Sequence, residues 1–154
     1  MITSALLLGA ATAALAAFPE KPITVVVPFA AGGPTDKVAR DLAEVLRKQL
    51  GQTVIIENLG GAGGTLGAAK VAKATPDGYT MLLHHIGMAT SPALYRKLPY
   101  DTLGDFEYLG MPNEVPVTLI GRSTLPASNM PDLLKWIDAN KGKIKLANAG
   151  LGAA

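Results

Sequence analysis

The alternation of short apolar runs with amphipathic stretches between residues 22 and 83 constrains the fold most strongly. The runs "PITVVVPF", "TVIIEN" and "YTMLLHH" are short and mostly apolar, as expected of strands buried on both faces of a sheet. Between the first two runs, apolar residues recur at the spacing of one helical face, at Val38, Leu42, Val45 and Leu46. Gly51 is the expected stop of this helix, and a second helix is expected over residues 65–74. Strand, helix, strand, helix, strand predicts a doubly wound α/β fold with a parallel sheet.

Small-residue loops follow the three predicted strands: "AAGGPTD", "LGGAGGT" and "HIGMATS". Open α/β sheets bind ligands outside the carboxyl ends of their strands. In the first loop, glycines at 32 and 33 allow close backbone approach, and a helix beginning near Pro34 offers free N–H groups. Thr35 and Asp36 add side-chain oxygens. We interpret this loop as a seat for an anion or polar group; the alternative is a tight turn in which Asp36 only complements the helix dipole.

The glycine-rich stretch "GAGGTLG", residues 61–67, has neither the G-x-G-x-x-G spacing nor the Lys-Ser/Thr pair of a phosphate-binding loop. A structural role is predicted instead, as a tight turn that also lets a helix pack closely on the sheet. His84 and His85 are adjacent, so on a strand they would point to opposite faces and could not chelate one metal ion. Ordinary packing is expected of them, or a polar contact from His85.

Several classes of function have no support in the composition. The chain contains no cysteine, which excludes disulfides and zinc–thiolate sites. Its formal charge of +2 is small and evenly spread, which argues against a nucleic-acid partner. Ser123 is not part of a G-x-S-x-G elbow. No catalytic residue, metal ion or cofactor is therefore predicted.

The two ends of the chain carry separate expectations. The opening "MITSALLLGAATAALAA" is uncharged, is too short to span a bilayer and ends in a small-x-small pattern, so residues 1–16 are predicted to be a secretory signal, although a basic n-region is missing. A buried N-terminal helix is the alternative. Further along, "EVPVTLIG" is predicted to be a strand, Ser128 to cap a helix reaching Asn140, and "KIKLANAG" to be another strand. A final strand and glycine loop without a helix suggests a fragment.

Four long segments, in this order, carry a specific resemblance: "FPEKPITVVVPFAAGGPTD", "GQTVIIENLGGAGGTLGAAKVAKATPDGYTMLL", "HHIGMATSPALYRKLPYDTLGDFEYLG" and "KLANAGLGAA". Together they resemble the periplasmic solute-binding proteins of tripartite tricarboxylate transporters, the Bug or TctC family. The resemblance covers the chain beyond the signal and corresponds to the N-terminal half of family members. Ser91 departs from the pattern, because asparagine before proline is common there.

The resemblance implies a type II periplasmic binding fold whose two lobes close over a small organic carboxylate, with backbone amides and waters making most contacts. It implies a first lobe over residues 17–121 and the start of a truncated second lobe over residues 122–154. The implied ligand-binding residues come from three loops: Phe29, Ala30, Ala31, Gly32, Gly33, Pro34, Thr35, Asp36, His85, Ile86, Gly87, Met88, Ala89, Thr90, Ser91, Ala149, Gly150, Leu151 and Gly152.

The resulting hypothesis is an exported, non-catalytic, periplasmic receptor that delivers a carboxylate to the membrane subunits of a transporter and is a monomer at full length. One alternative is a secreted α/β enzyme acting on a small carboxylate at the same edge of the sheet. Another is a sensor domain that signals to a partner when its lobes close. A receptor would return its ligand chemically unchanged, which separates it from the enzyme.

Overall fold

The computed structural model describes residues 18–114, 116, 118–145 and 147. The predicted signal segment and the loop of residues 149–152 lie outside the described residues. The elements follow the order β1 (Ile23–Val27), α1 (Pro34–Leu50), β2 (Val54–Asn58), the short 3₁₀ turn η1 (Ala62–Gly64), α2 (Thr65–Ala72), β3 (Thr80–Leu82), α3 (Gly87–Leu94) and α4 (Met130–Ala139).

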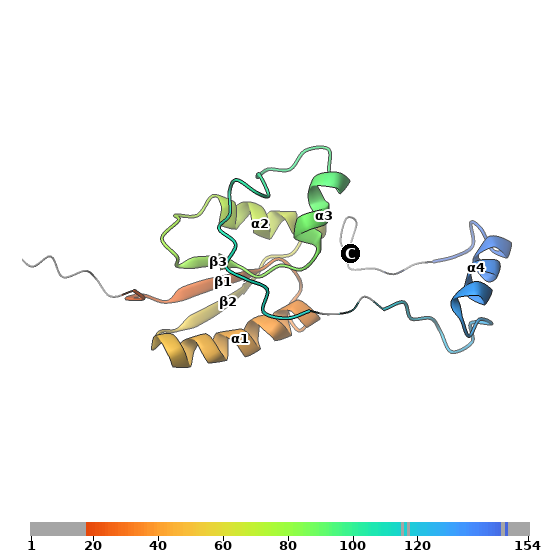
Figure 1. The fold of residues 1–154 in the computed structure, drawn as a ribbon, viewed down its shortest axis with the longest axis horizontal. Helices are drawn as coiled ribbons and strands as arrows, with labels where there is room; N and C mark the ends of the chain where they lie inside the picture. Colours follow the sequence, from red (N-terminus) through yellow and green to blue (C-terminus); the bar gives the residue numbers. More distant parts are fainter. Residues whose placement is uncertain (1–17, 115, 117, 146, 148–154) are drawn as a thin grey trace, which may run out of the picture.

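The three strands form a parallel sheet in the order β2-β1-β3. Ile23–Val27 pairs with Val54–Asn58, and residues 24–26 pair with Thr80–Leu82. Figure 1 shows α1 covering one face of this sheet, while α2 and α3 lie on the other. The predicted doubly wound α/β fold is confirmed. The central strand β1 is almost completely buried, as its β-branched and mostly apolar sequence indicates.

Two apolar clusters hold the layers together. On the α1 side, Val25 and Val54 of the sheet pack with Ala43 of the helix. On the other side, Ala68 of α2 packs with Met88 of α3 and with Tyr100 from the following loop. The predicted apolar face of α1 was partly wrong: Val45 is 55% exposed, whereas the buried helix residues include Ala39 and Ala43. The small side chains of Ala39 and Ala43 let the α1 backbone approach the sheet closely, so the helix–sheet contact is made mainly by these two residues.

Element ends match the sequence predictions to different degrees. Gly51 ends α1 as predicted, with φ of 67° and its N–H donated to the Arg47 carbonyl oxygen. The helix α2 ends at Ala72, two residues earlier than predicted, and β3 ends before its two histidines. In α4 the N-cap is Asn129 instead of Ser128, and its side chain accepts the Asp132 N–H at 2.9 Å.

Two predicted strands are not found among the residues that the structure describes. The described residues of 114–121 and of 144–147 contain no strand. Their alternating or apolar sequences are compatible with strands, but a strand also needs a neighbour for its backbone N–H and C=O groups, and Pro116 lacks a donor altogether. Figure 1 shows α4 apart from the α/β unit, and none of its residues is buried.

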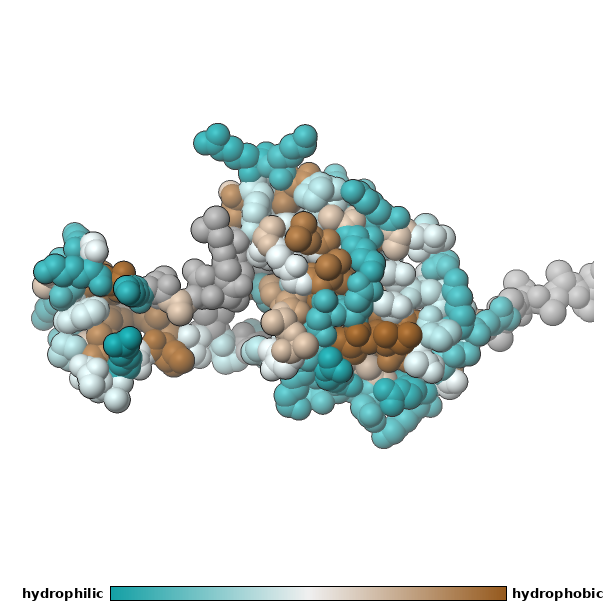
Figure 2. Space-filling view, turned by 180° about the vertical axis from the view of Figure 1, so that it is seen from behind, coloured by the Kyte–Doolittle hydropathy of each residue, from teal (hydrophilic) through white to brown (hydrophobic). Residues whose placement is uncertain are grey.

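Apolar side chains also reach the surface of the described part of the chain. Four of them are more than three-quarters exposed: Leu103, Leu109, Met111 and Ile120. Figure 2 shows hydrophobic patches among hydrophilic residues on the rear face of the α/β unit. Over the described residues, no helix is both long enough and apolar enough to cross a membrane.

Candidate functional site

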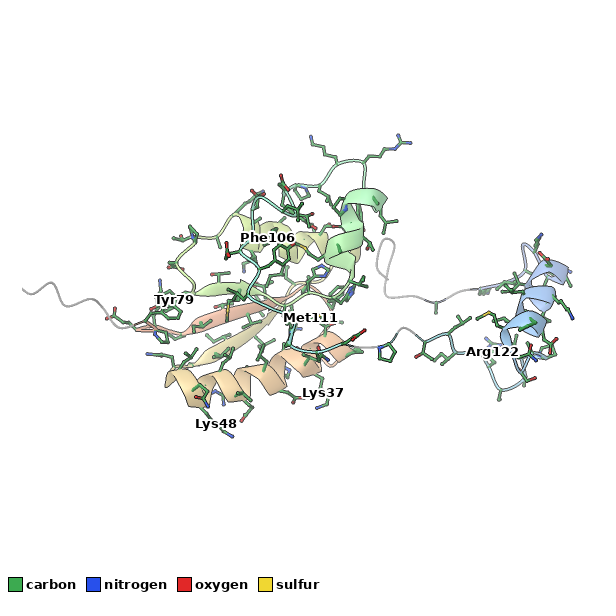
Figure 3. All side chains as sticks on the ribbon, in the orientation of Figure 1. Lys37, Lys48, Tyr79, Phe106, Met111 and Arg122 are labelled. Atoms are coloured by element: carbon green, nitrogen blue, oxygen red, sulfur yellow. The ribbon has the colours of Figure 1, made fainter. Side chains whose placement is uncertain are left out.

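The candidate site lies at the carboxyl edge of the sheet, where the loops after β1, β2 and β3 begin. Because the three strands are parallel, these loops leave the sheet at the same edge. Figure 3 marks the two edges: Lys37, near the start of α1, lies at the carboxyl edge, and Tyr79, just before β3, lies at the opposite one. The structure thus brings the first two predicted site segments, residues 29–36 and 85–91, to one edge.

A buried carboxylate holds the loop after β1 in shape. Asp36 is only 1% exposed, and its Oδ2 accepts hydrogen bonds from the Gly32 backbone N–H at 2.8 Å and from Arg40 Nε at 2.8 Å. Its Oδ1 accepts a bond from Asn58 Nδ2 at 2.9 Å. The same Asn58 amide group donates to the Phe29 carbonyl oxygen at 3.2 Å. Asp36 and Asn58 therefore tie the loop to α1 and β2.

This hydrogen-bond network stabilises the ionised form of Asp36. The hydrogen bond from Arg40, together with those from Gly32 and Asn58, holds the pKa of the Asp36 carboxyl well below its usual range. A carboxylate at a helix start would normally compete with an anionic ligand for the positive end of the dipole. Here its charge is paired with the Arg40 guanidinium and its oxygens are turned into the protein. Asp36 therefore does not compete with an anion for the positive end of the helix.

The first turn of α1 contains backbone N–H groups that have no partner within the helix. The first i→i−4 bond of the helix runs from the Lys37 N–H to the Gly33 carbonyl oxygen at 3.0 Å. The Thr35 and Asp36 amides precede it and have no intrahelical acceptor, and Pro34 has no N–H at all. Ala30, Ala31 and Gly32 beside them are exposed. This is the arrangement in which helix starts bind carboxylates and phosphates.

The glycine that the loop conformation requires is Gly32. Its φ is +79°, in the left-handed region, whereas Gly33 has φ of −75°. A Cβ at position 33 would instead meet the Ala30 carbonyl oxygen at 3.2 Å, so a side chain there would crowd the loop.

An aromatic cluster of Phe29, His84 and His85 joins the loops after β1 and β3. The His85 ring stacks on the Phe29 ring, with centroids 4.2 Å apart and planes at 19°. The His84 ring meets the Phe29 ring edge-on at 5.3 Å and the His85 ring at 5.1 Å. The predicted opposite orientation of the two histidines is wrong, because β3 ends at Leu82 and both rings turn to the same cluster. Burial lowers the pKa of His84 to about 4 and lowers the pKa of His85.

The loop after β3 uses its own donors internally. The Gly87 N–H donates to His85 Nδ1 at 2.9 Å, and the Met88 N–H donates to the His85 carbonyl oxygen at 3.0 Å. The Ala89 and Thr90 amides both donate to the Ile86 carbonyl oxygen. The Ser91 hydroxyl is buried and donates to the Met88 carbonyl oxygen at 3.1 Å. The Ser91 side chain is thus bonded into α3, and its Oγ also lies 3.4 Å from the Tyr100 hydroxyl oxygen.

The glycine-rich loop after β2 has a structural role at this edge, as predicted: its glycines allow close packing against neighbouring segments. A Cβ at Gly64 would lie 2.7 Å from His84 Nε2, so the absence of a side chain at Gly64 lets the aromatic cluster pack against its backbone. A Cβ at Gly67 would lie 2.7 Å from Pro28 Cβ and 2.9 Å from the Leu59 carbonyl oxygen. Gly67 therefore sets how closely α2 approaches the chain just after β1. Within the described residues, no group of three or more His, Asp or Glu side chains is arranged to hold a metal ion.

Two residues of this site were missed by the sequence reasoning. Asn58 and Arg40 hold Asp36, and both lie outside the predicted loops. A signal for Asn58 exists: it is a polar residue ending the apolar run "TVIIEN" at the carboxyl end of a strand. Arg40 follows Asp36 by one helical turn, the spacing of an i,i+4 ion pair. Glu44, which also lies one helical turn from Arg40, pairs with Arg47 instead.

A helix-covered parallel sheet with donor-bearing loops at its carboxyl edge is the architecture of a lobe of periplasmic binding proteins, and comparison with solved structures agrees. The chain matches periplasmic binding protein BugD with 48% identity and a TM-score of 0.75, over 89% of this chain and 46% of that one. It matches MatC from Rhodopseudomonas palustris with bound malate with 42% identity and a TM-score of 0.84, over 88% and 47%. A further R. palustris structure, with adipate, has 34% identity and a TM-score of 0.65, over 79% and 41%.

Sequence comparison identifies the family. Residues 38–154 match the model of the tripartite tricarboxylate transporter family receptor, TctC, and the chain belongs to this family. A relative from Agrobacterium vitis, the UPF0065 protein in the TAR-I ttuE-ttuC' intergenic region, is 50% identical over 88% of this chain and 39% of its own length. The chain thus spans less than half the length of these relatives. The resemblance seen in the sequence, and the type II periplasmic binding fold it implied, are confirmed.

Proposed function

We propose that this protein is a periplasmic receptor that binds a small organic carboxylate at the carboxyl edge of its sheet and delivers it to the membrane subunits of a tripartite tricarboxylate-type transporter. Family membership supports the receptor role, and the bound malate and adipate of two structural neighbours support the ligand class. The receptor itself is non-catalytic in this proposal and acts as a monomer.

The start of α1 carries the proposal. Its Thr35 and Asp36 amides have no intrahelical acceptor, the adjoining loop is exposed, and the only carboxylate within the turn is neutralised by Arg40. In the proposal, one carboxylate of the ligand accepts bonds from these amides. The loop of residues 149–152 is assigned to the opposite wall of the cleft, in a second lobe that begins near residue 122. Residues 1–16 are assigned to export.

Calorimetric titration of the full-length gene product with malate, succinate, adipate and benzoate tests the proposal. Succinamide, the neutral diamide of succinate, is the matched control, because it has the same carbon skeleton without an anionic end. At least one carboxylate should bind with a Kd of micromolar order or tighter, and succinamide should not. Equal binding of a carboxylate and its neutral amide would contradict an anion seat at the helix start.

The receptor and the enzyme are separated by recovering the ligand after prolonged incubation. A receptor returns every molecule unchanged, as judged by NMR of the filtrate, whereas an enzyme accumulates a product with time. Turnover proportional to protein concentration would refute the receptor assignment even if the binding site were correct.

A further inference from the structure

The loop after β3 differs from the loop after β1 in the donors that it can offer to a ligand. The amides at the start of α3 are already bonded: Gly87 to the His85 ring, Met88 to the His85 carbonyl oxygen, and Ala89 to the Ile86 carbonyl oxygen. The hydroxyl groups of Thr90 and Ser91 donate within α3 as well. This loop therefore cannot hold a ligand in the way that the α1 start can.

The His85 ring is a polar side chain that the same loop leaves available. Its Nδ1 accepts the Gly87 N–H, so the proton of the neutral imidazole must lie on Nε2. Among the described residues, no hydrogen-bond partner of Nε2 is found, and the ring is only partly buried. The stack on Phe29 at 4.2 Å holds the ring in place beside the loop that carries the α1 amides.

We propose that His85 is a specificity-determining residue of the carboxylate site, whose Nε2–H donates to a second acceptor oxygen of the ligand. This rests on the proposed function and refines it. The α1 amides take one carboxylate, and the His85 ring contacts a hydroxyl or second carboxyl oxygen. The ligand class is then a small carboxylate with a second oxygen acceptor, and a carboxylate with only an apolar remainder binds less tightly.

The imidazole is held in this neutral, donating state by its surroundings. A proton on Nδ1 would remove the acceptor of the Gly87 N–H and place positive charge beside the positive end of α3. The rings packed against His85 are Phe29 and His84, and neither supplies a negative charge. The lowered pKa of His85, caused by burial, agrees with a neutral ring at physiological pH.

Two substitutions separate a ligand contact from a purely structural role. In His85→Asn the side-chain oxygen can take the place of Nδ1 and keep the cap on the Gly87 N–H, but nothing replaces Nε2–H. In His85→Gln the amide N–H can reach the position of Nε2–H, while the acceptor for Gly87 is lost. Both variants lose the ring stacked on Phe29. The difference in ligand affinity between them therefore reports the separate roles of Nδ1 and Nε2. Lys48→Ala, at the far end of α1, serves as a surface control (Figure 3).

The experiment is calorimetric titration of the full-length gene product and its variants with malate, succinate, adipate and benzoate at pH 7.5, on protein shown to be folded by circular dichroism. For the tightest-binding probe, His85→Asn should weaken binding about ten-fold or more, the loss expected for a hydrogen bond to a charged acceptor. His85→Gln should stay within about three-fold of the wild type, and Lys48→Ala should be unchanged. Long-range ¹H–¹⁵N NMR should show the Nε2–H tautomer of His85, with the Nε2 resonance shifting when the probe is added.

The outcomes distinguish this inference from the proposed function. If the wild type binds a carboxylate and His85→Asn binds it equally well, the role of His85 is refuted and the receptor proposal stands. The reverse order, with Asn retaining affinity and Gln losing it, would assign His85 to capping α3 alone. An Nδ1–H tautomer in the wild type would also overturn the inference. If the wild type binds none of the four probes, both proposals fail together.

Discussion

Folding stability should fall as pH is lowered from 7.5 to 5, and His84 should be a main cause. The ring is largely buried against Phe29 and His85, and burial lowers its pKa to about 4 from an ordinary value of 6.5. Between these two values the unfolded chain binds a proton at His84 that the folded protein does not. The free energy of unfolding therefore rises with pH across this window, and the stability is lost as pH falls through it.

The magnitude follows from the two pKa values. For a group with pKa 6.5 unfolded and about 4 folded, the linkage relation gives a loss of about 2 kcal/mol between pH 7.5 and pH 5. His85 contributes in the same direction, because its pKa is also lowered by burial. Asp36 acts in a different range: its pKa is lowered, so its contribution is present above 3.8, its ordinary pKa, and is lost only as pH falls below that value.

Urea unfolding of the full-length gene product at pH 7.5, 6.5, 5.5 and 5.0 measures this dependence, with His84→Asn as the matched variant. Asparagine can keep an acceptor for the His85 N–H, which lies 2.9 Å from His84 Nδ1, but it does not titrate. Between pH 7.5 and pH 5, the free energy of unfolding should fall by about 2 kcal/mol less in the variant than in the wild type. This difference does not depend on the stability of the variant at pH 7.5, since all other histidines are common to both proteins. Parallel stability–pH curves for the two proteins would refute the assignment of a buried neutral imidazole at position 84.

Three further predictions follow from single positions. Gly67→Ala should destabilise the protein by about 1–2 kcal/mol in urea unfolding, because its Cβ would lie 2.7 Å from Pro28 Cβ and the cost of overpacking exceeds the gain in helix propensity. The control Gly110→Ala, whose Cβ would have nothing within 4 Å, should change stability by less than about 0.5 kcal/mol. Equal effects of the two substitutions would contradict the close helix–sheet contact at Gly67. Gly32→Ala should cost about 1–2 kcal/mol and weaken carboxylate binding, because φ at this position is +79°; unchanged thermal unfolding would show that the loop does not need this conformation. N-terminal sequencing of the exported protein should start near Ala17, and a mature protein that retains Met1 would exclude the predicted signal.

Local sequence patterns were sufficient for the layered fold. The runs that form β1 and β2, the helix from Pro34 and its end at Gly51 all follow from residue types and spacing within one element. The meeting of the small-residue loops at one edge was predictable too, because the direction of parallel strands places all their carboxyl ends together. The structural role of residues 61–67 was also predicted correctly, although the partners of Gly64 and Gly67 were not.

What the sequence determined by itself was the set of elements, their order and the edge of the sheet that carries small-residue loops, because these depend on periodicity and on backbone preferences close along the chain. Only the tertiary structure decided how those loops function. Asp36 is turned inward because Asn58, 22 residues away, and Arg40 meet it at the end of β2. His84 and His85 face one cluster because β3 ends at Leu82 and Phe29 lies beside them. The contacts of Asp36 with Asn58 and of the two histidine rings with Phe29 join residues distant in sequence, and no local pattern records that these residues meet.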